Sequence, residues 1–332
     1  MLNQSLKLNT KIFNDDVEKI STRQGFGEGL LKSGTDNENI VALSADLTES
    51  TKANLFAEKF PNRFIDVGVA EQNLASVASG IASMGKIPFI ASYGIFNPGR
   101  NWEQIRTTIC YNNQPVKIIG SHAGLSVGPD GGSHQMLEDI ALMRVLPNMV
   151  VLSPCDAIEA KKATIACSKT KYPTYIRLSR NNTPIITTED TPFEIGTAQI
   201  VFKPEVGLAR VGIIATGPIL YKAIMAGHEL EKRGIKVKVL NLSTIKPLDE
   251  NAIIALAKET RAIVTVEDHQ IAGGMGSAVA ECLVENYAVP TLFVGVDNKF
   301  GQSGTPEELE KYYKIDVSDI VKNVERVIKR KI

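Results

Sequence analysis

Residues 66–74 read DVGVAEQNL, and they place one acidic residue, Glu71, between a predicted strand and a predicted helix. The strand is the β-branched segment 64–67, which ends at Gly68. The helix is the run of small residues 74–84, in which apolar positions recur at helical spacing. Open α/β sheets bind ligands where strands end, so Glu71 is either a functional carboxyl or an ordinary acidic residue in a first helical turn.

The N-terminal part of the chain alternates short apolar strands with helical patterns. The expected strands are 39–44, 64–67, 87–92, 115–120, 149–153 and 174–178. The expected helices are 22–33, 51–60, 74–84, 101–111, 136–144 and 157–168. Short apolar strands that alternate with helices favour a parallel sheet covered on both faces.

A second alternating unit follows a stretch rich in Asn, Thr and Pro, which is typical of a linker with short strands. Its expected strands are 211–215, 236–242, 262–266 and 291–294, and its expected helices are 220–232, 250–260, 276–285 and 317–330. The predicted fold class is therefore α/β, with two doubly wound, mostly parallel sheets. We divide the chain into an N-terminal extension (1–20), a first domain (21–185), a linker (186–207) and a second domain (208–332).

Composition narrows the range of functions. The 332 residues are 43% hydrophobic and 22% charged, as in a soluble globular protein. Lys plus Arg and Asp plus Glu each number 37, so we expect no nucleic-acid partner. Apolar runs are only strand-length and the N-terminus is polar, so we expect neither a membrane span nor a signal peptide. The four cysteines lack metal-ligand spacing, which favours a reducing cytoplasm, and we interpret Cys155, at a helix start, as a packed thiol.

The two glycine-rich stretches do not form a nucleotide site. Neither 120–132 nor 273–276 is followed by the GKS or GKT of a phosphate-binding loop. The stretch 273–276 opens a helix after a strand but lacks the GxGxxG spacing, which favours close helix packing. The chain thus carries no convincing diphosphate motif.

The densest polar constellation is the two-histidine loop, residues 120–135, which reads GSHAGLSVGPDGGSHQ. It follows a predicted strand, and its glycines allow close approach to a ligand. His122 and His134, with Asp130 between them, suit acid–base or hydroxyl-binding roles near neutral pH. Three aromatic residues follow the strand 87–92, where each either stacks on a flat ring or packs in the core: Tyr93, Phe96 and Trp102.

Taken together, these segments resemble the C-terminal part of transketolases over nearly the whole chain. The segments that carry the resemblance are TRQG (22–25), SADL (44–47), GVAEQ (68–72), the two-histidine loop, LPNM (146–149), LSR (178–180), TIKP (244–247) and EDH (267–269). Transketolases have a diphosphate-binding, a pyrimidine-binding and a C-terminal domain. The resemblance covers the last two, so it implies that 21–185 is the pyrimidine-binding domain and 208–332 the C-terminal domain.

One departure is decisive. The chain has no GDG motif with the downstream Asn that holds Mg²⁺ and the diphosphate of thiamine diphosphate in this family. The resemblance therefore implies one subunit of a split transketolase, whose cofactor lies at the interface with a separate N-terminal subunit. We expect no metal ligand in this chain, Mg²⁺ or another divalent cation on the partner, and homodimerisation within an α2β2 heterotetramer in the cytoplasm.

The resemblance also implies roles at the cofactor. Such an enzyme, of the pentose phosphate pathway, transfers a two-carbon ketol unit from a ketose phosphate to an aldose phosphate. Glu71 would share a proton with N1′ of the aminopyrimidine ring. An apolar environment would raise the pKa of Glu71 and the helix N-terminus would lower it, which the sequence leaves open. Tyr93 and Phe96 would flank the ring, Trp102 would assist them, and Asp46 would help to place the cofactor from the partner side.

The remaining implied roles concern the substrate. His122 and His134, with Glu71, would be catalytic and contact donor hydroxyls, and Asp130 would bind a hydroxyl. The sugar phosphate would be held by Arg23, Ser50 and Arg180, and Arg177 competes with Arg180 for that role.

Three alternatives remain. The β subunit of a 2-oxoacid dehydrogenase decarboxylating component has the same two-domain plan, but the GPDGGSHQ segment and Arg180 favour sugar-phosphate binding. A deoxyxylulose-phosphate synthase usually lacks the first histidine of the loop, so His122 argues against it. A scaffold subunit or a relative without activity is the third alternative, and the presence of Glu71 and both histidines counts against it.

Overall fold

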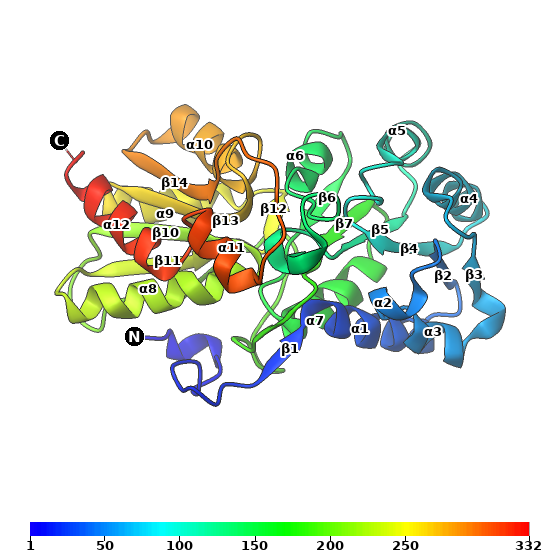
Figure 1. Ribbon diagram of the computed structural model, residues 1–332, viewed down its shortest axis with the longest axis horizontal. Helices are drawn as coiled ribbons and strands as arrows, with labels where there is room; N and C mark the ends of the chain where they lie inside the picture. Colours follow the sequence, from blue (N-terminus) through cyan, green and yellow to red (C-terminus); the bar gives the residue numbers. More distant parts are fainter. Residues whose placement is uncertain (332) are drawn as a thin grey trace.

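A computed structural model describes residues 1–331, which form two α/β units side by side along the long axis (Figure 1). Residue 332, the last of the predicted second domain, lies outside the described residues. No helix within this described part is both long and apolar enough to cross a membrane.

The first sheet has seven strands in the order β12-β6-β7-β5-β4-β2-β3. Six of them are parallel and overlap the predicted strands: β2 (Ile40–Ser44), β3 (Phe64–Asp66), β4 (Ile87–Tyr93), β5 (Lys117–Ser121), β6 (Val150–Leu152) and β7 (Thr174–Arg177). Because parallel strands end at one edge, the residues that follow β3, β4 and β5 are brought close together.

Helices cover both faces of this sheet, with α4 (Glu71–Ser83) on one side and α1 (Thr22–Asp36) and α7 (Ala157–Ser168) on the other (Figure 1). The last two pack backbone to backbone, because a Cβ on Gly25 would lie 1.8 Å from the Ala157 carbonyl oxygen. The structure corrects three predicted helices. Segment 51–60 is split at Lys52, whose φ is 69°, into α2 (Thr48–Thr51) and α3 (Asn54–Lys59). Segment 101–111 comprises α5 (Trp102–Gln104) and a π-helix (Ile105–Cys110), and α6 (Asp139–Arg144) begins three residues later than predicted.

The second sheet has the order β14-β13-β10-β11-β9. Its predicted strands are present as β10 (Val211–Ala215), β11 (Val237–Asn241), β13 (Ile263–Gln270) and β14 (Thr291–Val296). The predicted helices are α8 (Leu220–Lys232), α9 (Glu250–Thr260), α10 (Met275–Asn286) and α12 (Val317–Ile328), and a further helix, α11 (Pro306–Tyr312), was not predicted. The predicted α/β class with two mostly parallel sheets is confirmed.

The predicted linker and N-terminal extension are both ordered parts of the fold. Strand β9 (Gln199–Phe202) forms an antiparallel edge of the second sheet, and Leu8 and Ile12 are buried in the core of the second unit. A small antiparallel pair, β1 (Lys19–Ser21) with β8 (Asn182–Pro184), connects the chain before and after the first unit. The first residues of the chain therefore pack on the unit that is farthest from them in sequence.

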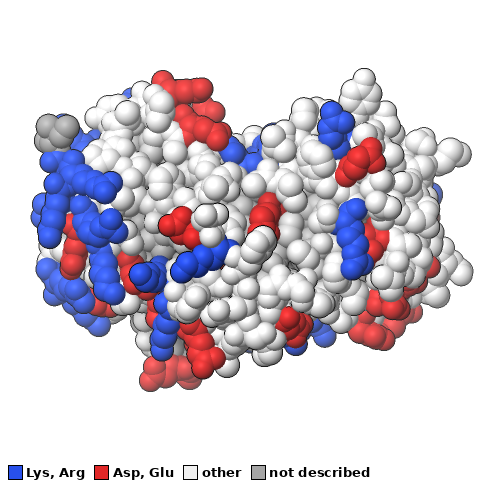
Figure 2. Space-filling view, turned by 45° about the horizontal axis from the view of Figure 1, so that its top comes forward, with Lys and Arg blue, Asp and Glu red and all other residues white. Residues whose placement is uncertain are grey.

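The two units share a continuous interface. Strand β12 (Thr244–Lys246) leaves the second unit and pairs antiparallel with β6 of the first sheet (Figure 1). One hydrophobic cluster contains Leu74 and Ile118 from the first unit together with Ile214 and Leu240 from the second. On the surface, Lys and Arg gather at the end of the molecule that carries the C-terminus, and the first unit shows fewer charges on the same face (Figure 2).

Candidate active site

Glu71 is the first residue of α4, and its side chain is only 4% exposed. The turn before it is held by Asp66, whose Oδ1 accepts hydrogen bonds from the N–H groups of Gly68 (2.8 Å) and Asp46 (3.1 Å). Gly68 has a φ of +71°, a conformation that glycine adopts without strain. The amide of Asn101 donates to the Glu71 carbonyl oxygen at 2.9 Å. Both features that the sequence left open are therefore present: Glu71 begins a helix, and its carboxyl group is buried.

The Glu71 carboxylate has one cationic partner, Arg100, among the residues that the structure describes. The Nη1 atom of Arg100 lies 3.3 Å from Oε1 and 3.2 Å from Oε2 of Glu71. The same guanidinium lies over the ring of Phe96, 4.1 Å from its centroid. A hollow of about 470 Å³ opens here and is lined by residues 69–73 and Arg100. Sequence reasoning missed Arg100, because a single arginine after a strand carries no signal of its own.

A row of rings runs from this hollow to the two-histidine loop. Phe96 and Tyr93 are stacked with centroids 5.9 Å apart and an interplanar angle of 14°. Tyr93 stacks on His122 with centroids 3.8 Å apart, and the rings of Phe96 and His134 form a T-shaped pair with centroids 5.7 Å apart. Four residues predicted for the site are therefore linked by successive ring contacts, and Arg100 connects them to Glu71.

The two histidines differ in their environment. His122 is buried directly after β5, with a φ of 55°, and its Nδ1 lies 2.9 Å from the hydroxyl of Ser121. Burial, together with the nearby cations Arg23 and Arg180, lowers the pKa of His122 to about 3. Its imidazole is therefore neutral at pH 7, and it can accept or donate a hydrogen bond without charge. His134 is half-buried, and its Nδ1 lies 2.9 Å from the Ser133 hydroxyl.

Arg23 and Arg180 are the two cations that help to lower the pKa of His122. Arg23 donates from Nη1 to the backbone carbonyl of Ser50 at 2.7 Å, so Ser50 contributes its backbone to this contact. The Nε of Arg23 is buried without a hydrogen-bond partner in the described chain, and burial lowers the pKa of Arg23. Arg180 donates to the Val127 carbonyl at 2.6 Å and lies 3.6 Å from Asp130, with 37% of its side chain exposed. These cations form one positive region beside the two-histidine loop.

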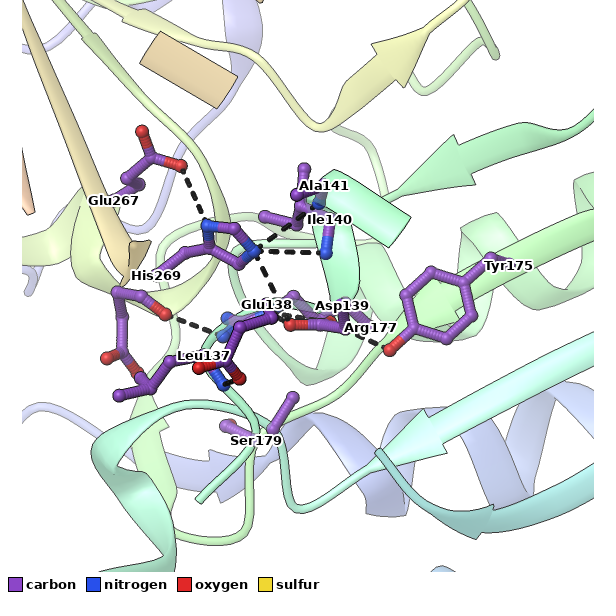
Figure 3. A network of polar contacts seen from close by, with 12 residues as sticks. Leu137, Glu138, Asp139, Ile140, Ala141, Tyr175, Arg177, Ser179, Glu267 and His269 are labelled. Carbon is purple, nitrogen blue, oxygen red and sulfur yellow. Dashed lines mark hydrogen bonds and ion pairs between the residues drawn. The ribbon is translucent and has the colours of Figure 1, made fainter. Parts of the chain in front are cut away.

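Arg177 is committed to the interface between the units. Its side chain is 5% exposed, its Nε lies 3.0 Å from Asp139, and its Nη2 donates to the Asp268 carbonyl at 2.6 Å. Figure 3 shows Arg177 beside Asp139, which also accepts a hydrogen bond from the hydroxyl of Tyr175 at 2.7 Å. Of the two arginines that compete for the phosphate role, only Arg180 is therefore accessible.

The EDH segment, at the end of β13, holds two helices (α10 and α6) and the two-histidine loop in place. Glu267 accepts from the N–H groups of Met275 (2.7 Å) and Gly276 at the start of α10, and burial raises its pKa to about 7. Asp268 accepts from the N–H of Leu125 at 3.1 Å. His269 donates from Nδ1 to the Gln270 carbonyl, so its Nε2 accepts from Ile140 at the start of α6 (Figure 3).

This interface also fixes the two-histidine loop at its far end. Gln135 donates to the carbonyl oxygens of Gly128 (3.1 Å) and Gln302 (2.9 Å). Gly132 lies so close to the segment around Gly301 that a Cβ would be 2.5 Å from the Gly301 carbonyl oxygen. The second unit therefore holds the loop at Leu125 and again at Gln135. The sequence contained the EDH segment but not the contacts of Asp268 with Leu125 and of His269 with Ile140, which join residues more than 100 positions apart.

Trp102 and Asp46 are outside the row of rings. Trp102 packs against the hydrophobic core, and its indole N–H donates to the Leu142 carbonyl at 2.8 Å. Asp46 is exposed after β2, with a φ of 60°. Burial raises the pKa of the Cys155 thiol well above its usual value, in agreement with its interpretation as a packed thiol.

Comparison with known proteins identifies close relatives. A family model described as the transketolase pyrimidine-binding domain matches residues 18–185, and the transketolase C-terminal domain matches residues 205–320. A putative transketolase C-terminal section from Methanocaldococcus jannaschii is 43% identical, and the match covers 93% of this chain and 96% of the relative. A 6-deoxy-6-sulfo-D-fructose transketolase subunit from Clostridium sp. is 37% identical, with 96% and 98% covered.

Two further matches concern chain length and structure. Human transketolase is 36% identical, but the match spans 94% of this chain and only 49% of the human protein. A solved structure described as a split-gene transketolase, inactive β4 tetramer, superimposes with a TM-score of 0.87 at 42% identity. That match covers 94% of this chain and 100% of the other.

Proposed function

This chain belongs to the transketolase family and contains its pyrimidine-binding and C-terminal domains, and from that premise we propose that it is one subunit of a split transketolase. The chain corresponds to almost the full length of two relatives that are named as a section and as a subunit. It corresponds to only half of the human enzyme. We infer that a separate polypeptide carries the diphosphate-binding domain.

The residues around Glu71 fit the aminopyrimidine ring of thiamine diphosphate, the cofactor of this family. Glu71 is a buried carboxylate at the wall of a hollow, and Phe96 presents a flat face beside it. Arg100 indicates which kind of group fits this site. Its guanidinium is planar and positively charged, donates N–H hydrogen bonds to the Glu71 carboxylate and lies over the Phe96 ring. A protonated nitrogen heterocycle is likewise planar, positively charged and an N–H donor.

The bound cofactor would supply the carbanion chemistry that carries a two-carbon unit, and the protein would supply orientation and proton transfer. Glu71 would share a proton with N1′ of the ring, and Phe96, which itself stacks on Tyr93, would hold the ring by stacking. His122, neutral at pH 7, would bind a hydroxyl of the substrate, and His134 would exchange a proton with a neighbouring oxygen. Asp130 would accept a hydrogen bond from a further hydroxyl.

The positive region at Arg23 and Arg180 favours a substrate with an anionic end. A phosphate accepts two parallel hydrogen bonds from a guanidinium, so we propose ketose and aldose phosphates as substrates. The Clostridium relative is named for a sulfonated sugar, and a sulfonate has similar hydrogen-bonding oxygens. The natural donor is therefore to be identified among phosphorylated and sulfonated ketoses.

The proposed assembly has two kinds of subunit, because the diphosphate-binding domain would be on a separate chain. We propose that the partner binds the diphosphate with Mg²⁺ or another divalent cation, and that two copies of each chain form a heterotetramer. We further propose that the complex is a cytoplasmic enzyme of the pentose phosphate pathway; the location is supported by the four buried cysteines, which are free within the described residues.

The observation that carries the proposal is the set of contacts that runs from Glu71 through Arg100 to Phe96, and from Phe96 to His134 and, through Tyr93, to His122. The test is product analysis with the reconstituted pair of subunits and ketoses ¹³C-labelled at C1 and C2. We expect both labelled carbons to appear together in the lengthened aldose phosphate. Release of one labelled carbon as carbon dioxide, or no transfer from any phosphorylated or sulfonated ketose, would overturn it.

A further inference from the structure

We propose that Arg100 is a placeholder that occupies the cofactor's ring position in the free chain and must leave when the ring binds. This inference rests on the proposed function, because it assumes that Glu71 and Phe96 receive an aminopyrimidine ring. It concerns regulation of that site. In the free subunit, the Arg100 side chain would fill the ring site until the cofactor binds together with the partner.

The geometry of Arg100 carries the inference. Its guanidinium makes the two contacts expected of the ring, an N–H donor contact with the Glu71 carboxylate (3.2 and 3.3 Å) and a face contact with Phe96 (4.1 Å). A second planar group cannot occupy the same space against Phe96 and donate to the same carboxylate. Arg100 and the ring are therefore competitors.

Burial explains why the free chain needs this contact. Glu71 is 4% exposed, and a buried carboxylate without a partner is strongly unfavourable. Arg100 supplies the opposite charge that the cofactor ring would otherwise supply as a protonated nitrogen. The isolated subunit is thereby stable without ligand.

Exposure explains why the contact is reversible. The Arg100 side chain is 51% exposed, so its guanidinium can move into water with little loss of hydration. The backbone beside it is fixed, because Asn101 donates to the Glu71 carbonyl (2.9 Å) and to Asn97 (3.0 Å). Release of Arg100 thus requires only rotation of its side chain, and the Glu71 site stays in place.

The first experiment measures cofactor binding to the reconstituted complex by calorimetry, with thiamine diphosphate and Mg²⁺ as the titrant. Arg100→Met removes the charge but keeps a long flexible chain, and we expect its Kd to fall ~3- to 10-fold because the ring no longer displaces an ion pair. Arg106→Met, an exposed arginine in the same segment, is the matched control and should leave Kd unchanged.

The second experiment tests the coupling. In a Glu71→Gln background, Arg100→Met should change Kd by less than about twofold, since no carboxylate remains to hold the guanidinium. In the isolated chain, Arg100→Met should lower the melting temperature, and the added Glu71→Gln should restore part of the loss. This arm reports the ion pair without cofactor or turnover.

The outcomes separate the two claims. Weaker or unchanged cofactor binding by Arg100→Met would overturn the placeholder and leave the proposed function standing. An unaltered melting temperature of the isolated Arg100→Met chain would also overturn it. A wild-type complex that binds no thiamine diphosphate would overturn both the proposed function and the placeholder.

Discussion

Asp268 of the second unit accepts a hydrogen bond from the backbone N–H of Leu125 at 3.1 Å, across 143 positions of sequence. Gly124 makes the approach possible, because it has a φ of +77° and a Cβ there would lie 2.0 Å from the carboxylate. The C-terminal domain therefore positions the two-histidine loop of the other domain, although it contributes none of the proposed site residues.

We predict that Asp268→Asn raises KM for the sugar phosphate about 3- to 10-fold, because an amide is a weaker acceptor for the Leu125 N–H and the loop loses its fixed position. Cofactor Kd should not change, since Glu71 and Phe96 have no contact with this carboxylate. Steady-state kinetics and calorimetry on the complex measure both quantities. Asp297→Asn, an exposed change in the same domain, is the control, and an equal effect of both variants would contradict the positioning role.

Glu71→Gln should lower kcat of the complex about 10²-fold or more, because the amide cannot exchange a proton with the ring nitrogen. The fold should remain, since glutamine has the same shape and Asn101 still holds the backbone of position 71. Turnover and the circular dichroism of the complex are the measurements. Undiminished turnover would remove Glu71 from the mechanism.

His122 predicts a pH dependence of stability. Its pKa is lowered from 6.5 to about 3, chiefly by burial, so between these values the unfolded chain binds more protons than the folded chain. Stability should therefore fall as pH decreases from about 6.5 towards 3. Urea unfolding at pH 4.5 and 7.5 should show a smaller difference for His122→Gln than for the wild type. The same difference in both proteins would show that His122 is not buried in neutral form.

Two glycines provide a paired test of the fold. Gly25→Ala should destabilise the chain by about 2 kcal/mol or more, because the added Cβ would lie 1.8 Å from the Ala157 carbonyl oxygen and α1 would have to move away from α7. Gly80→Ala in α4 meets nothing within 4 Å and should stabilise by about 0.5–1 kcal/mol through helix propensity. Thermal unfolding of both variants measures the difference, and similar effects would contradict the close packing of α1 and α7.

The features that can be predicted from the sequence are local ones. Periodicity located the parallel strands, and the strand–helix junction at Glu71 followed from β-branched residues, one glycine and a run of small residues. The two histidines and Tyr93 could be predicted as site candidates because polar and aromatic residues followed strand ends.

The features that escaped prediction depend on distant contacts. Arg100 reaches Glu71 only because the segment after β4 folds over the start of α4. Arg177 is buried where β13 of the other unit lies against it. Trp102 followed the same strand as Phe96, yet the turn of α5 directs its indole N–H to Leu142. Nothing in the residue types distinguishes these outcomes.

Cofactor binding shows whether this chain holds half of an active site. Thiamine diphosphate with Mg²⁺ should be titrated by calorimetry into this chain alone, into the partner subunit alone and into their mixture. We expect tight binding and ketol transfer only in the mixture, because Glu71 and its aromatic neighbours provide a site for the ring but not for the diphosphate. Tight binding and robust transketolase activity with this chain alone would contradict it.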